Sequence, residues 1–132
     1  MTAEKQSSLR SDLGRARGLG SAKDGTHHWW MQRVSAIAMI PPIFYFLYNI
    51  DHVVSSDYVG FVNWMTQPLP ALAMLLFVVT SFYHAALGIQ VIIEDYIHCE
   101  GKKFFFLLLN KLFFFFLSFA TAYAVVRLNF GF

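Results

Sequence analysis

The chain has 132 residues, of which 57% are hydrophobic and 14% are charged, so its apolar surface is too large for one small soluble core and we expect lipid as its solvent. The formal net charge of +2 is small and the basic residues form no stripe, which excludes nucleic acid as a partner. The one cysteine, Cys99, excludes an internal disulfide, and we interpret it as a spectator thiol.

The N-terminal residues 1–26 are polar and basic, and their four glycines disfavour a stable helix. We predict a flexible cytoplasmic tail, with ordering against a partner or against lipid headgroups as the alternative. Residues 27–132 are predicted to form one membrane domain with spans at about 29–50, 69–97 and 104–127.

The first predicted span begins with a tryptophan pair, Trp29 and Trp30, at the place of an interfacial aromatic belt. Arg33 is its only charged residue, and about 20 helical residues are enough to cross a hydrocarbon core of ~30 Å. Pro41 and Pro42 predict a kink whose freed carbonyls a neighbouring helix can satisfy. Residues 51–69 are expected to form a short polar connection.

Orientation is predicted from the basic residues. Lysines and arginines are concentrated in residues 1–26 and recur in the second connection, residues 94–103, whereas residues 51–69 have none. The positive-inside rule places the N-terminus and residues 94–103 on the cytoplasmic side. Lys111 lies within the third span, and we expect its long side chain to extend back to the nearer interface. The fold class is therefore an all-α membrane protein with three transmembrane helices.

A histidine, His84, falls within the apolar second span. It precedes Glu94 by ten residues, or about 15 Å of helical rise, which is close to the bilayer midplane. At that depth an ionisable group normally faces the interior of a helix bundle. His84 is either hydrogen-bonded between helices or an axial ligand of haem iron, for which imidazole is a common nitrogen donor. No other histidine lies at this depth, so a haem would be shared with a partner chain.

The same helix face carries further polar groups. Gly88 and Asp95 follow His84 on that face. Gly88 indicates either a close approach of helices or clearance for a flat macrocycle. Asp95 and Tyr96 form either an ordinary interfacial pair or a quinone pocket, in which the hydroxyl donates to a carbonyl and the carboxylate orients it or relays protons. Arg33 is either an interfacial anchor or a permanent cation for an anionic group such as a haem propionate.

Two segments carry a family resemblance. The stretch from His84 to His98, with its His-x10-Asp-Tyr spacing, resembles the second-helix motif of the succinate dehydrogenase membrane anchor family, in its smaller hydrophobic type. Residues 27–33, His-His-Trp-Trp-Met-Gln-Arg, are similar to the segment that opens the first helix in alphaproteobacterial members. About 35 residues match closely, whereas the third span matches only in character. The patterns Ser-Pro-His and His-Arg-x-Thr-Gly, which are expected of the sister anchor subunit, are missing.

The resemblance implies a role for each candidate. His84 would be an axial ligand of haem b, with the second histidine supplied by the sister anchor subunit. Tyr96 would hydrogen-bond ubiquinone beside Asp95, and Arg33 would lie near a haem propionate. The three helices would pack with the sister anchor subunit into a haem-containing bundle.

The resemblance also implies an assembly. Electrons would come from succinate through the flavoprotein subunit and the iron–sulfur subunit, docked on the cytoplasmic face. The chain would be a non-catalytic subunit of succinate:quinone oxidoreductase, or respiratory complex II. Its membrane would be the bacterial inner membrane, with the mitochondrial inner membrane as the alternative. The competing interpretations are a fumarate reductase anchor and a structural or assembly membrane protein.

Overall fold

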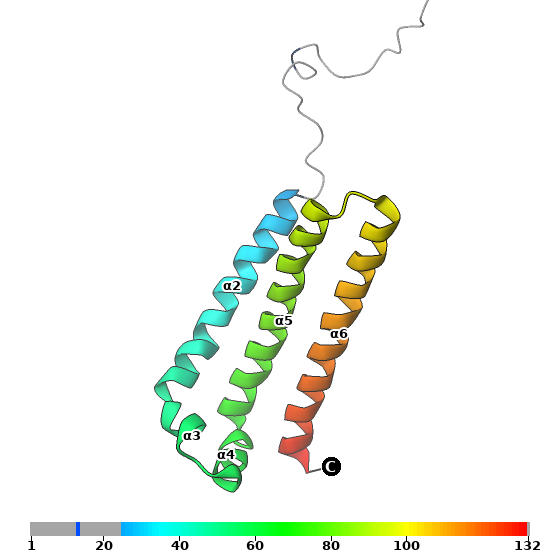
Figure 1. Ribbon diagram of the computed structural model, residues 1–132. Helices are drawn as coiled ribbons and strands as arrows, with labels where there is room; N and C mark the ends of the chain where they lie inside the picture. The colour runs from blue at the N-terminus through cyan, green and yellow to red at the C-terminus, as the bar shows by residue number, and fades with distance from the viewer. Residues whose placement is uncertain (1–12, 14–24, 132) are drawn as a thin grey trace, which may run out of the picture.

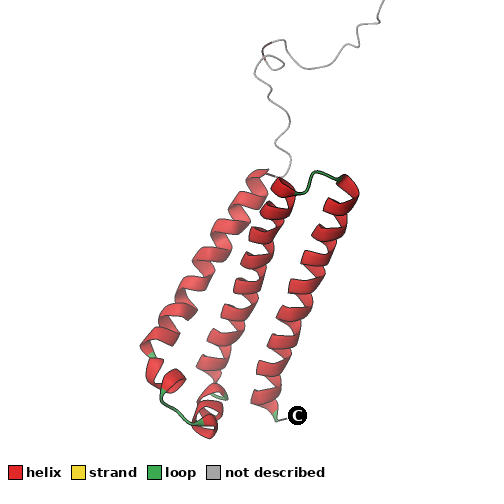
Figure 2. Ribbon diagram, in the orientation of Figure 1, coloured by secondary structure: helices red, strands yellow, loops and turns green. Residues whose placement is uncertain are grey.

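Three long helices lie side by side in the computed structural model, which describes Leu13 and residues 25–131 (Figure 1). They are α2 (Gly25–Tyr48), α5 (Pro68–Tyr96) and α6 (Glu100–Phe130). Two short helices, α3 (Ile50–Val54) and α4 (Tyr58–Met65), connect α2 to α5. Every regular element among the described residues is helical, which confirms the predicted all-α class (Figure 2). The predicted tail lies outside the described residues, except for Leu13 and the first two residues of α2.

The middle helix is α5, which packs against α2 on one side and α6 on the other (Figure 1). It begins at Pro68, whose missing N–H would have no partner in the first turn in any case. It ends at Tyr96 because Ile97 adopts an extended backbone. The last helix, α6, ends at Phe130, and Gly131 follows it with a φ of 69°, the left-handed conformation that glycine readily adopts at a helix C-terminus. The start of α2 and the end of α5 lie at the same end of the molecule (Figure 1).

Two of the described helices, α5 and α6, are long and apolar enough to cross a membrane. They have 29 and 31 residues, and their most apolar windows both have a mean hydropathy of 1.9. Few of those residues are buried within the chain, so their apolar side chains need lipid or another protein as a neighbour. The 24-residue helix α2 begins with a more polar segment, and it continues through Pro41 and Pro42 to Tyr48.

The predicted connection between the first two spans is largely helical, because residues 51–69 include most of α3 and all of α4. Asp57 caps α4 by accepting a hydrogen bond of 2.8 Å from the Gly60 backbone N–H. Trp64 and Met65 are buried, and Trp64 stacks on the ring of His52 with centroids 5.3 Å apart. These large apolar side chains pack the connection against the end of the helix bundle.

A buried amide joins the last two long helices. Asn110 on α6 is only 7% exposed, and its Nδ2 donates a hydrogen bond of 2.9 Å to the backbone carbonyl of Ala86 on α5. Nearby, the rings of Phe82 and Phe114 lie with centroids 6.3 Å apart across the same pair of helices. Apolar surfaces alone give little specificity between helices in lipid, so this polar contact fixes their relative position.

We expect Asn110→Ala to destabilise the packing of α5 against α6 by about 1 kcal/mol, within the range measured for hydrogen bonds between membrane helices. The fraction of purified complex that stays assembled during a titration with denaturing detergent measures this loss. Asn63→Ala is the matched control, because the Asn63 side chain is exposed on α4. An equal effect of the two substitutions would show that the Asn110 amide contributes nothing specific.

Candidate functional site

The imidazole of His84 is held between α5 and α2 by two polar side chains. Its Nδ1 lies 3.0 Å from the hydroxyl oxygen of Ser35, and its Nε2 lies 3.2 Å from the amide nitrogen of Gln32. Both ring nitrogens therefore have partners on the neighbouring helix. A hydrogen-bonded histidine between helices was one of the two interpretations of the sequence, and this arrangement occurs within the chain itself.

The contacts of Ser35 and Gln32 are consistent with one position of the His84 ring proton. The Ser35 hydroxyl also lies 3.1 Å from the backbone carbonyl of Gln32, to which it donates its single proton. The same oxygen then accepts a hydrogen bond from Nδ1–H of His84. The Nε2 atom keeps its lone pair and accepts a hydrogen bond from the Gln32 amide. This assignment satisfies every contact, and it leaves the imidazole in the form that can bind a metal through Nε2.

A groove of about 610 Å³ runs along the seam between α2 and α5. Its walls include Gln32, Gly88 and Val91. A Cβ atom added to Gly88 would lie 3.8 Å from the Gln32 amide nitrogen, which is an ordinary contact distance. The packing of α2 on α5 within this chain therefore does not require glycine at position 88. The absence of a side chain at Gly88 instead leaves this part of the groove open.

Asp95 and Tyr96 lie at the end of α5, and both are exposed. At about 100° per residue, Asp95 shares the helix face of His84, whereas Tyr96 is rotated by about 120° from it. Along the helix axis, Tyr96 lies about 18 Å from His84. The structure therefore keeps the two parts of the candidate site apart, and Tyr96, with 79% of its surface exposed, has room for contacts from another molecule.

Arg33 is exposed near the start of α2. Its guanidinium lies 5.5 Å from the ring centroid of Trp29, one turn earlier on the same helix, in a cation–π contact. The contact holds the positive charge at the end of the molecule where α5 terminates (Figure 1). Arg33 directly follows Gln32 in the sequence, so the cation and the His84 contact come from the same helical turn.

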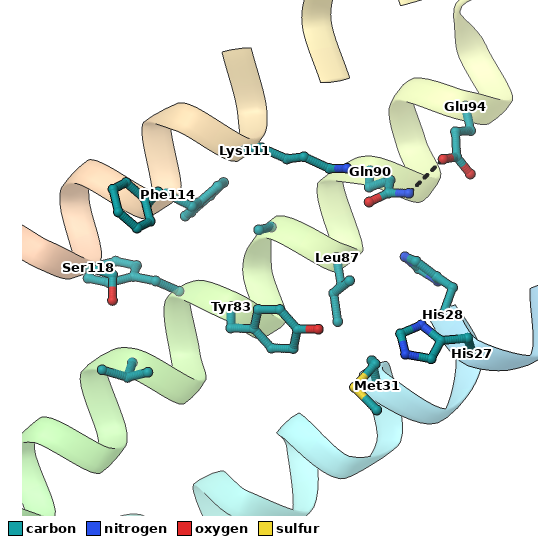
Figure 3. Close-up of a pocket in the computed structure, with 14 residues that line it drawn as sticks. His27, His28, Met31, Tyr83, Leu87, Gln90, Glu94, Lys111, Phe114 and Ser118 are labelled. Carbon is teal, nitrogen blue, oxygen red and sulfur yellow. Dashed lines mark hydrogen bonds between the residues drawn. The ribbon is translucent and has the colours of Figure 1, made fainter. Parts of the chain in front are cut away.

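A second, larger groove of about 820 Å³ lies among α2, α5 and α6, and the sequence did not predict it. Its walls are mostly apolar, but His27, His28, Gln90, Glu94 and Lys111 bring polar groups to it (Figure 3). Gln90 donates a hydrogen bond of 2.8 Å to Glu94 one turn later, a spacing that the sequence does contain. In the close-up, Lys111 extends toward Gln90.

Among the residues that the structure describes, no three histidine, cysteine or acidic side chains gather where they could hold one metal ion. His84 is a single imidazole, and its Nε2 lone pair accepts the hydrogen bond from the Gln32 amide. The Gln32 amide covers Nε2 in this chain, so it has to move before Nε2 can bind iron.

The comparisons with known proteins that find a match indicate one family. The family model for the succinate dehydrogenase/fumarate reductase transmembrane subunit matches residues 7–119. The succinate dehydrogenase hydrophobic membrane anchor subunit of Rickettsia bellii (strain RML369-C) is 39% identical over 106 residues, which are 80% of this chain and 84% of the relative. The protein with the same description from Paracoccus denitrificans is 29% identical over 116 residues, 88% and 89% of the two chains. No solved structure matches significantly.

Proposed function

Because this chain belongs to the succinate dehydrogenase/fumarate reductase transmembrane subunit family, we propose that it provides one axial ligand for a haem and one wall of a quinone pocket. The chain is a membrane anchor subunit of succinate dehydrogenase and is not catalytic by itself. The chain is located in the bacterial inner membrane. In this proposal α2 is a third transmembrane helix beside α5 and α6, and the end of the molecule with Arg33 and Tyr96 faces the cytoplasm.

The observation that carries the haem proposal is the Ser35–His84 contact. It leaves the proton on Nδ1 and the lone pair on Nε2, which is the donor that haem iron requires. The haem b would be bound between His84 and a histidine of the sister anchor subunit, and it would supply one-electron redox chemistry within the bilayer. Gly88 leaves space beside the ligand, and Arg33 is available for a propionate. A b-type absorption band that depends on His84 tests the proposal.

The quinone proposal rests on the position and exposure of Tyr96. Its hydroxyl lies at the membrane boundary in this arrangement, where it can donate a hydrogen bond to a carbonyl of ubiquinone. Asp95 is its neighbour in the chain and can orient the headgroup or relay protons. Because Tyr96 is 79% exposed, the other walls have to come from the sister anchor subunit and from the iron–sulfur subunit, which receives electrons from the flavoprotein subunit.

The sequence alone had left two other functions open. A fumarate reductase anchor has the same family description, and the potential of its quinone would set the direction of electron flow. A structural or assembly protein would use the hydrogen bonds of His84 only for packing α5 against α2. The visible spectrum separates the packing role from the ligand role, because only a ligand changes the absorption of haem.

Arg33→Gln is expected to lower the midpoint potential of the haem by some tens of millivolts, because a nearby positive charge stabilises the reduced form. A redox titration of the purified complex, followed by visible absorption, measures the potential. Arg33→Lys keeps a positive charge and is expected to restore most of the potential, although it loses the planar geometry for a propionate. An unchanged potential in Arg33→Gln would contradict a contact between Arg33 and the haem.

A further inference from the structure

We propose that Ser35 is a positioning residue for the His84 ring in haem binding and that the Gln32 amide temporarily blocks Nε2 of the same ring. Ser35 holds the His84 ring with its proton on Nδ1, while the Gln32 amide occupies Nε2 until haem is inserted. This inference rests on the proposed ligand role of His84. The two side chains that contact the His84 ring behave differently when haem binds. The Ser35 contact persists in the loaded complex, and the Gln32 contact is lost.

The Ser35 side chain is buried between α2 and α5. Only 5% of Ser35 is exposed, and its hydroxyl contacts both the Gln32 carbonyl and Nδ1 of His84. A metal-bound histidine almost always donates its other N–H to an oxygen, which fixes the tautomer and orients the ring. Without the Ser35 oxygen, Nδ1–H would lose its acceptor, and the proton could move to Nε2. That tautomer has no lone pair on Nε2 for iron.

The Gln32 amide covers the Nε2 side of the His84 ring. Its amide nitrogen is 3.2 Å from Nε2 of His84, and one lone pair cannot serve both an N–H donor and a metal. The other end of the Gln32 side chain, Oε1, is buried and has no hydrogen-bond partner. Such an unsatisfied oxygen makes this position of the side chain a poorly stabilised one. Gln32 also lines the groove of about 610 Å³, which gives the side chain space to leave His84.

The test measures how fast purified complexes lose haem to an excess of apomyoglobin, together with the ratio of haem to protein. Ser35→Val is expected to lose haem about 10- to 100-fold faster than Ser35→Thr, because the two side chains have the same shape and only threonine keeps the hydroxyl. Gln32→Ala is expected to keep haem at least as well as the unchanged complex. Thr121→Val is the control for removing a hydroxyl, since Thr121 donates only to the Leu117 carbonyl of its own helix.

Equal rates of haem loss in Ser35→Val and Ser35→Thr would overturn the role of Ser35. Rapid haem loss from Gln32→Ala would overturn the role of Gln32, because it would indicate that the packing of the whole α2–α5 seam retains the haem. Either failure is distinguishable from a failure of the proposed function. If the proposed function were wrong, the His84→Ala complex would keep a normal b-type haem, regardless of how the variants at positions 32 and 35 behave.

Discussion

Replacing Tyr96 by phenylalanine is expected to slow quinone reduction by the complex about 100-fold, while succinate oxidation with an artificial soluble acceptor continues at the unchanged rate. The substitution removes only the hydroxyl that we propose donates to the quinone carbonyl, and the loss of one such donor at a developing negative charge costs about 10²–10³ in rate. Phenylalanine keeps the ring at the membrane boundary. Assays of one preparation with both acceptors separate the quinone step from the electron supply.

Tyr58→Phe is the matched control for this experiment. Tyr58 is 80% exposed, compared with 79% for Tyr96, but it lies in α4 at the opposite end of the molecule (Figure 1). We expect this variant to have the activity of the unchanged complex with both acceptors. An equal loss of both activities in Tyr96→Phe would indicate an assembly defect, and full quinone reduction in that variant would contradict the quinone role.

The helical class was predictable because the composition and the long apolar runs of the sequence both favour helices. A chain with so few charges and such long apolar runs has to place its backbone hydrogen bonds within helices when its solvent is lipid. Pro68 marks the start of α5 by its chemistry, and the structure begins the helix there. The two short helices of the connection before α5 were not predicted, because they are stabilised by the burial of Trp64 and Met65 against residues that are distant in the sequence.

The partners of His84 were not predictable to the same extent. Gln32 and Ser35 are visible as polar residues near the start of the first helix, and their spacing of three places them on one face. The sequence of one chain does not tell which face of α2 meets which face of α5, because that choice depends on packing along both helices. For the same reason, the sequence predicts that Tyr96 lies at a boundary but not what surrounds it.

Replacing His84 by alanine has the largest expected effect, because it removes the proposed axial ligand from the centre of the proposed bundle. The purified complex is expected to contain no b-type haem, while the contacts of α5 with α6 through Asn110 remain. His98→Ala is the matched control, since His98 is exposed just beyond the end of α5 and does not contact this network. That variant is expected to keep the haem content of the unchanged complex.

The reduced-minus-oxidised absorption spectrum of the purified His84→Ala complex is the most direct test of the shared haem site. We expect the b-type band to be lost from a complex that still contains its partner subunits and still oxidises succinate with a soluble acceptor. A b-type band of unchanged size and position in that assembled complex would contradict the account, because His84 would then serve only to pack α5 against α2.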